Sequence, residues 1–153
     1  RNKKEGKLPD FQPFPGINLG KGGLLVVSPR HAERDDPSVH PWILDDGKGG
    51  EFCGSGKNPS ATVRFPKAGT VSGIVLIGHA KEGVQKRLVP SVVEISEDGK
   101  TWREIARLTE IKHVYRIPVE KTSDYTRFAR VRLEGKQDRY TFYGIFVYGE
   151  KKE

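Results

Sequence analysis

The sequence of 153 residues contains no methionine and only one cysteine, Cys53. A single cysteine cannot form an internal disulfide, so the fold must be stabilised by its hydrophobic core. No apolar run approaches the roughly 20 residues that a membrane-spanning helix needs, and no signal peptide is recognisable. Because the first residue is not methionine, we expect the chain to be a mature secreted domain or a module cut from a longer protein.

Long amphipathic helical patterns and runs of lysine or arginine are also missing. Glycine and proline are frequent, at 18 and 10 residues, which indicates many turns and predicts an all-β protein. The length is typical of one domain. The formal net charge of +7 and the isoelectric point near 9.5 favour an anionic partner: nucleic acid, a lipid headgroup or an acidic polysaccharide.

Motifs for catalysis and metal chemistry are incomplete. The loop at 30–36 carries a histidine and carboxylates, but no evident nucleophile stands beside them. Gly54-Ser-Gly-Lys57 resembles the end of a phosphate-binding loop, yet Glu51 replaces its first glycine and Asn58 its magnesium-binding hydroxyl. Cys53 and the four histidines do not have zinc-site spacing. We therefore predict that the protein is not an enzyme.

Nucleic-acid binding would use the positive charge, but no recognition module is present. Arg130 and Arg132 alternate with apolar residues on a predicted strand, and we interpret them as a solvated face. We predict no nucleic-acid partner.

The clearest local pattern is a predicted hairpin. Val92, Val93 and Ile95 lead into Asp98-Gly99, and glycine tolerates the positive φ of a tight turn. Trp102 follows the turn, where its ring can be buried against a facing sheet. Such a hairpin needs a larger sheet around it.

Three segments resemble the discoidin, or F5/8 type C, domains, which include galactose-binding-like and family 32-type carbohydrate-binding modules. Val93-Glu-Ile-Ser-Glu-Asp-Gly-Lys-Thr-Trp102 resembles their central hairpin, Arg127-Phe-Ala-Arg-Val-Arg-Leu-Glu134 their penultimate strand, and Tyr143-Gly-Ile-Phe-Val-Tyr-Gly149 their closing strand. The resemblance covers roughly Leu24 to Gly149. It implies an antiparallel β-sandwich of jelly-roll type that binds rather than catalyses.

The predicted organisation follows from these patterns. Residues 1–23 form an extended N-terminal segment, 24–150 the sandwich, and 151–153 a charged tail. The main predicted core strands, besides the hairpin, are 24–28, 61–65, 71–77, 114–119, 128–133 and 143–149. Long polar loops are predicted at 29–42, 78–87 and 135–141. Phe11 and Phe14 either clip the N-terminal segment onto the sandwich or offer a contact to a neighbouring molecule.

Discoidin-like modules hold their ligands in loops at one end of the sandwich. Here the predicted loops carry Arg30, His31, His79 and Arg87, whose planar cationic or imidazole groups suit sugar hydroxyls and carboxylates. Tyr140 could stack on the apolar face of a pyranose. For each residue alone, a structural or solvated role is the competing interpretation.

The resemblance also implies a structural calcium beside an Asp-Gly turn, here Asp45 and Asp46. The glutamate that the family adds in its closing strand is absent, because that position is Gly144. The alternative is that the two aspartates only form an Asx-type turn.

These observations predict a non-catalytic, extracellular carbohydrate-binding module of a larger secreted or surface protein. The positive charge favours an acidic or sulfated glycan. The alternative is a structural, self-associating extracellular domain that assembles through residues 1–23.

Overall fold

The computed structural model describes residues 8–31, 33–120, 124–135 and 139–153. Its strands are β1 (Ile17–Asn18), β2 (Leu24–Ser28), β3 (Phe52–Ser55), β4 (Ser60–Ile77), β5 (Ser91–Ser96), β6 (Arg103–Leu108), β7 (Val114–Pro118), β8 (Thr126–Leu133), β9 (Arg139–Phe142) and β10 (Gly144–Lys151). Its helices are α1 (His40–Ile43) and α2 (Glu82–Gln85), with two 3₁₀ turns, η1 (Pro37–Val39) and η2 (Lys86–Leu88). All strand pairs are antiparallel, and the predicted all-β sandwich class is confirmed.

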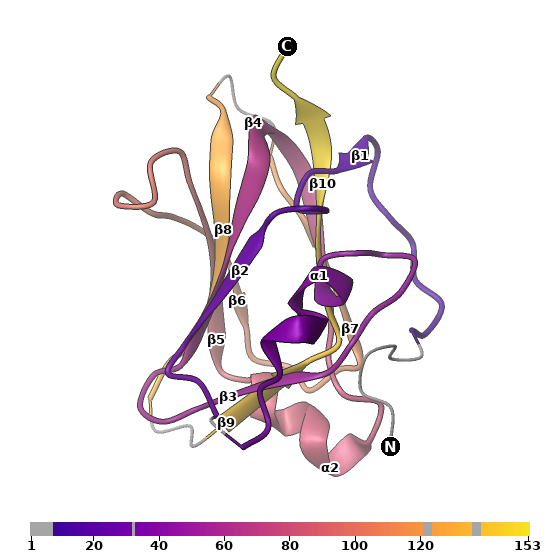
Figure 1. Ribbon diagram of the computed structural model, residues 1–153, viewed down its shortest axis with the longest axis vertical. Coiled ribbons are helices and arrows are strands. Elements are labelled where there is room, and N and C mark those ends of the chain that lie inside the picture. Colours follow the sequence, from indigo (N-terminus) through magenta and orange to yellow (C-terminus); the bar gives the residue numbers. More distant parts are fainter. Residues whose placement is uncertain (1–7, 32, 121–123, 136–138) are drawn as a thin grey trace.

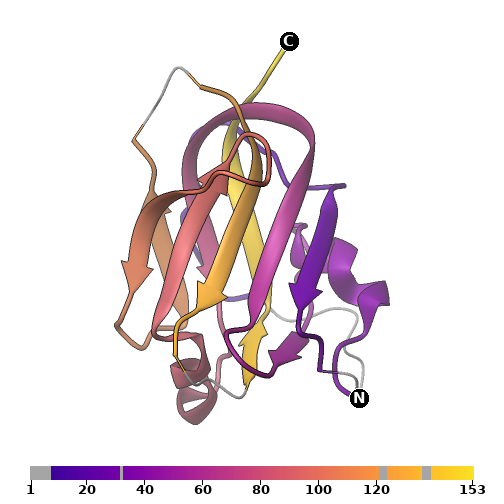
Figure 2. The ribbon, with the colours of Figure 1, turned by 90° about the vertical axis from the view of Figure 1, so that its left-hand side faces the viewer.

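One strand, β4, belongs to both layers of the sandwich. Its residues 60–64 pair with β2 and β8, whereas residues 69–77 pair with β10 and residues 73–77 with β7. Between them the register shifts and the strand arches from one layer to the other (Figure 2). The sequence predicts two separate strands here, because Pro66 and Gly69 interrupt the apolar pattern. The structure instead has one strand with a bend at these residues.

The two layers enclose the main core. The first sheet contains β2, the start of β4, β8, β5 and β6; the second contains β1, β10, the end of β4 and β7. Alternation along β4 buries Ala61, Val63 and Phe65 completely against the facing layer, where Ile74 and Leu76 are also buried. Burying such a side chain contributes about 1.5–3 kcal/mol. Burial of these side chains therefore stabilises the fold, as expected for a chain that cannot form an internal disulfide.

The N-terminal residues 8–16, here called the N-terminal strap, cover the outer face of the second sheet. Phe14 is buried against a cluster that includes Val75 and Tyr148, and the ring of Phe11 stacks on Phe146 at 5.4 Å. The Arg116 guanidinium lies 3.8 Å from the Phe14 ring centre, and its Nε donates to the Gln12 carbonyl at 2.9 Å. The phenylalanines thus clip the strap onto their own domain, which is the first of the two sequence-based interpretations.

The predicted hairpin is present as β5 and β6. Asp98 and Gly99 lie in its turn, and Gly99 has φ of 78°. Trp102 does not face the opposite sheet as expected. Its ring is half-buried and contacts Phe128 edge-on at 6.4 Å, with the Arg130 guanidinium 3.9 Å from its centre. None of the helices in the described ranges is long and apolar enough to cross a bilayer.

Candidate ligand-binding end of the sandwich

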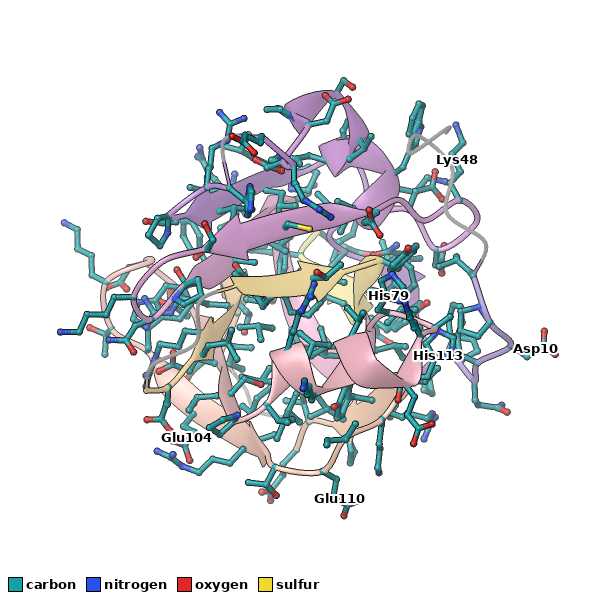
Figure 3. All side chains as sticks on the ribbon, turned by 90° about the horizontal axis from the view of Figure 1, so that it is seen from below. Asp10, Lys48, His79, Glu104, Glu110 and His113 are labelled. Atoms are coloured by element: carbon teal, nitrogen blue, oxygen red, sulfur yellow. The ribbon has the colours of Figure 1, made fainter. Side chains whose placement is uncertain are left out.

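The predicted loops at 29–42 and 78–87 lie at one end of the sandwich, opposite the arch of β4. Of the third predicted loop, 135–141, residues 136–138 lie outside the described residues, and residues 139–141 belong to strand β9 rather than to a loop. This loop end is formed by the segment after β2, by α2 and η2, and by the ribbon of β3 and β9 (Figure 1). Seen from below, α2 and the β3–β9 ribbon lie side by side across it, with His79 and His113 at its margin (Figure 3). Arg30, His31, His79 and Arg87 all come from elements of this end.

The first loop is held by a buried carboxyl group, that of Asp35. Its Oδ2 accepts from Arg30 Nε at 2.7 Å, and its Oδ1 lies 2.8 Å from His40 Nε2. The Asp35 side chain has no exposed surface, whereas half of the Arg30 side chain is exposed. An ion pair of this geometry fixes one edge of the guanidinium and leaves the rest at the surface. Arg30 is therefore presented in one orientation.

Tyr140 lies beneath this loop rather than at its surface. The residue is fully buried in β9, and its ring meets Phe142 edge-on at 5.3 Å. Gly54 lies against the ring so closely that a Cβ there would come within 2.3 Å of it. Burial and the nearby Asp35 carboxylate raise the pKa of the Tyr140 hydroxyl well above its ordinary value. The ring offers no face to a sugar in this structure, so the stacking role predicted for Tyr140 is not available to it.

His79 joins the second loop to its neighbours. Its Nε2 lies 3.5 Å from Glu51 Oε2, which also accepts from the Tyr143 hydroxyl at 2.6 Å. The Lys81 amide donates to His79 Nδ1 at 2.9 Å, which places the ring proton on Nε2, toward Glu51. The ring meets Tyr143 edge-on at 5.2 Å. Both ring nitrogens thus have protein partners, so His79 sets the position of this loop.

Arg87 and His31 are less constrained. Arg87 lies in η2, half-buried, and no hydrogen bond or ion pair joins its guanidinium to another described residue. His31 is also half-buried, and its Nδ1 has no hydrogen-bond partner within the described ranges. Counting only partners within the described residues, Arg87 has more unengaged donors than Arg30, the other predicted ligand arginine.

The predicted calcium turn has internal partners. Asp45 Oδ1 accepts from the Gly47 amide at 2.9 Å, as in an Asx turn, and its Oδ2 lies 3.8 Å from Lys21 Nζ. Asp46 Oδ2 accepts from the Tyr148 hydroxyl at 2.7 Å. Among the residues that the structure describes, no three His, Cys, Asp or Glu side chains gather as a metal site would require. Asp45 thus forms the Asx-type turn of the alternative interpretation, and calcium binding at this turn stays a prediction.

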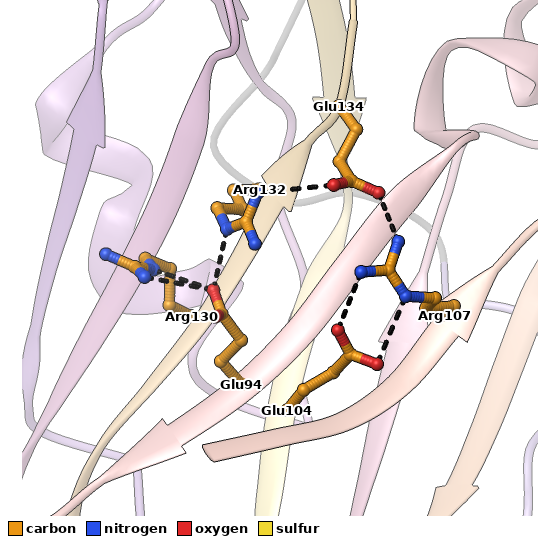
Figure 4. A network of polar contacts seen from close by, with 6 residues as sticks. All are labelled: Glu94, Glu104, Arg107, Arg130, Arg132 and Glu134. Carbon is orange, nitrogen blue, oxygen red and sulfur yellow. Dashed lines mark hydrogen bonds and ion pairs between the residues drawn. The ribbon is translucent and has the colours of Figure 1, made fainter. Parts of the chain in front are cut away.

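The arginines on the outer face of the first sheet are paired with glutamates. Glu94 Oε1 accepts from Arg130 at 3.0 Å and from Arg132 at 2.9 Å (Figure 4). Arg132 also approaches Glu134, and Arg107 bridges Glu134 to Glu104. The network contains as many carboxylates as guanidinium groups. It is electrically neutral, so these three arginines are not free cations for phosphates.

Comparison with known proteins places the fold. No family model matches the sequence, and no curated protein matches it significantly. Many solved structures do match, and the following three have TM-scores near 0.7. One is a family 32 carbohydrate-binding module of Clostridium perfringens in complex with GalNAc-β-1,3-galactose, with 12% identity, TM-score 0.67, and coverage of 87% of this chain and 100% of that one.

The chain has the discoidin-like fold. A Streptococcus pneumoniae fucose-binding module superimposes with TM-score 0.72 at 11% identity, covering 88% of this chain and 99% of the other. A chitosan-binding module of a chitosanase/glucanase from Paenibacillus sp. gives 0.67 at 16% identity, covering 87% and 99%. Among the matches, the structural neighbours are carbohydrate-binding modules and lectin domains, not catalytic domains. The discoidin-like sandwich predicted from three sequence segments is therefore confirmed.

Sequence reasoning missed the residues that shape the loop end. Asp35, His40, Glu51 and Tyr143 fix the loops through contacts between segments far apart in the chain. The one available signal was the pairing of carboxylates with histidines in otherwise polar loops. That signal does not tell which pairs meet.

Proposed function

We propose that this discoidin-like sandwich is a non-catalytic, extracellular glycan-binding module whose ligand lies at the loop end. The observation that carries the proposal is Arg87, a half-buried arginine whose guanidinium has no hydrogen bond or ion pair to another described residue, in the loop that His79 and Glu51 hold in position. The similar structures supply the class of ligand, since they include modules that bind galactose-containing, fucosylated and chitosan glycans.

The chemistry of this end favours planar polar recognition. A guanidinium group donates two parallel hydrogen bonds to a carboxylate or sulfate, or to neighbouring hydroxyls of a pyranose. Arg30 is held by Asp35 with half of its side chain at the surface, which limits the entropy lost on binding. With Arg30 and Arg87 at this end and a net charge of +7 for the whole chain, we favour acidic or sulfated glycans.

A glycan array at low and at physiological salt tests the proposal. We expect Arg87→Ala to lower the affinity at least tenfold, and Arg87→Lys to recover only part of it because a lysine cannot donate bidentately. Arg64→Ala is the matched control, since Arg64 is an exposed arginine on β4 away from the loop end.

Two outcomes would contradict the proposal. If no glycan binds, the module is not a lectin. If binding is equal in wild type, Arg87→Ala and His79→Ala proteins, the ligand lies elsewhere. An affinity that does not change with salt would exclude the acidic-glycan refinement alone.

A further inference from the structure

A cavity lined by aromatic and polar side chains lies at the end of the sandwich opposite the loop end. There the turn between β5 and β6 and the start of β8 enclose a cavity of about 230 Å³. Thr126, a buried residue of its lining, pairs with Gly69 where β4 arches between the layers. The cavity is lined by Ile95, Ser96, Glu97, Asp98, Thr101, Trp102, Arg103, Asp124, Tyr125 and Thr126.

The wall formed by the turn is rigid. Asp98 Oδ1 accepts from the amides of Lys100 and Thr101 at 2.8 and 2.9 Å. Ser96 Oγ donates to the Thr101 carbonyl at 2.6 Å and accepts from the Gly99 amide at 2.8 Å. A wall fixed in this way loses little conformational entropy when a ligand binds.

Aromatic rings and hydrogen-bonding groups alternate around the cavity. Trp102 is half-buried and is held from outside the cavity by Arg130. Tyr125 is 39% exposed, and the Lys152 ammonium lies 4.9 Å from its ring centre. Glu97 and Arg103 are exposed beside these rings. Rings with a few polar groups around one concavity match the two faces of a pyranose, which has an apolar C–H side and a rim of hydroxyls.

The charged groups of the lining determine which class of sugar the cavity accepts. The lining itself carries three carboxyl groups, those of Glu97, Asp98 and Asp124, against one guanidinium from Arg103. Outside the lining, Arg130 and Lys152 contact the Trp102 and Tyr125 rings, at 3.9 and 4.9 Å from their centres. Carboxylates accept hydrogen bonds from sugar hydroxyls but repel uronic acids and sulfated sugars. This selection is opposite to the one expected at the loop end.

We propose that this cavity is a second carbohydrate site, specific for uncharged pyranoses. The molecule then binds sugars at both ends of the sandwich, in an aromatic cavity at one end and at Arg30 and Arg87 at the other. The assignment rests on the cavity and its aromatic walls and not on the loop-end site, so each site can fail without the other.

An NMR titration of the ¹⁵N-labelled protein tests the second site directly. The probes are methyl β-galactoside, methyl α-fucoside and N-acetylglucosamine, with glucuronate as the anionic counterpart. We expect at least one uncharged sugar to shift the amide resonances of Gly99 and Thr126, and glucuronate to leave them unchanged. Tyr125→Ala and Glu97→Gln should each weaken this binding at least fivefold. Both substitutions are at exposed positions and should preserve the fold.

Two control variants separate the sites. Glu110→Gln removes an exposed carboxylate elsewhere, and Arg87→Ala alters the loop end; neither should change binding at Gly99 and Thr126. The proposal is overturned if no uncharged sugar shifts these resonances, if glucuronate shifts them equally, or if Tyr125→Ala and Glu97→Gln bind like wild type. Shifts confined to the loop end would overturn the second site and support the first.

Discussion

Asp35 illustrates how single buried groups decide the shape of the loop end. Its carboxyl group is inaccessible and contacts both Arg30 and His40. Nothing in the local sequence separates Asp35 from Asp36 beside it, whose carboxyl group caps the turn at Pro37–Val39 instead. Residue-scale roles of this kind depend on tertiary contacts, and the sequence could not predict them. The same applies to Tyr140, which a polar neighbourhood in the sequence placed in a loop and the structure buries in a strand.

Replacing Asp35 should destabilise the fold. We expect Asp35→Asn to lower the free energy of unfolding by about 1–3 kcal/mol, because a neutral amide cannot satisfy the Arg30 guanidinium and His40 together. Urea denaturation measures the change. Asp10→Asn, at an exposed carboxylate of the strap, should change stability by less than about 0.5 kcal/mol. Equal effects of the two substitutions would show that Asp35 does not hold the loop.

Asp98 makes the hairpin turn sensitive to acid. Hydrogen bonds from the Thr101 and Lys100 amides lower the pKa of Asp98 from its ordinary 3.8. Because the folded-state pKa is below the unfolded one, the carboxylate stabilises the turn above the unfolded pKa, and this stabilisation is lost as the pH falls through the folded value. We expect the protection factors of the Lys100 and Thr101 amides, which compare their exchange with the intrinsic rates, to fall as the pH drops below about 4. Asp98→Asn should abolish this pH dependence; an unchanged profile would refute it.

At the scale of elements, the sequence predicted the turns and strands that depend on interactions between neighbouring residues. The Asp-Gly turn, the alternation in β8 and the bounds of β2 all follow from a few neighbouring residues. The β3–β9 ribbon could not be predicted, because it joins a glycine-rich segment to one that follows it by more than 80 residues. The helices at 40–43 and 82–85 are too short for a helical period to be visible.

The N-terminal strap is held by the Phe14 ring, which packs directly on Gly73. A Cβ at Gly73 would lie 2.2 Å from the ring atoms of Phe14. We expect Phe14→Ala to lower the unfolding free energy by about 3 kcal/mol, and Gly73→Ala to displace the strap. Both should increase the binding of an apolar dye to the exposed sheet. Ile111→Ala, at a side chain that is 55% exposed, should have neither effect, and a wild-type response from Phe14→Ala would show that the strap does not protect this face.

At the scale of the whole molecule, the fold was predictable and the ligand site only in part. Three segments in the right order indicated the sandwich, because the fold is encoded in many independent apolar positions. The loop end depends on a few polar contacts between distant segments, so the sequence indicated where cations gather but not which ones remain at the surface.

The strap also changes the expectation for self-association. The sequence-based alternative is a domain that assembles through residues 1–23, so that their removal abolishes assembly. Since the strap covers an apolar face of its own domain, we expect the opposite: removal of residues 1–15 should expose Val75, Phe146 and Tyr148 and promote association. Sedimentation velocity at several concentrations measures this. A truncated protein that remains monomeric would show that the uncovered face is not adhesive.

The path of β4 through both layers has a consequence for how the chain tolerates length changes. Side chains alternate along a strand, so one inserted residue would turn every following side chain to the opposite face. In β4, an insertion before Arg64 would turn core-facing side chains outward and outward-facing side chains inward, in both layers of the sandwich. The segment between Arg64 and Gly69, where the pairing already shifts, is the place where an extra residue can be absorbed. Insertions and deletions among related sequences should therefore occur at this bend and be absent from the rest of β4.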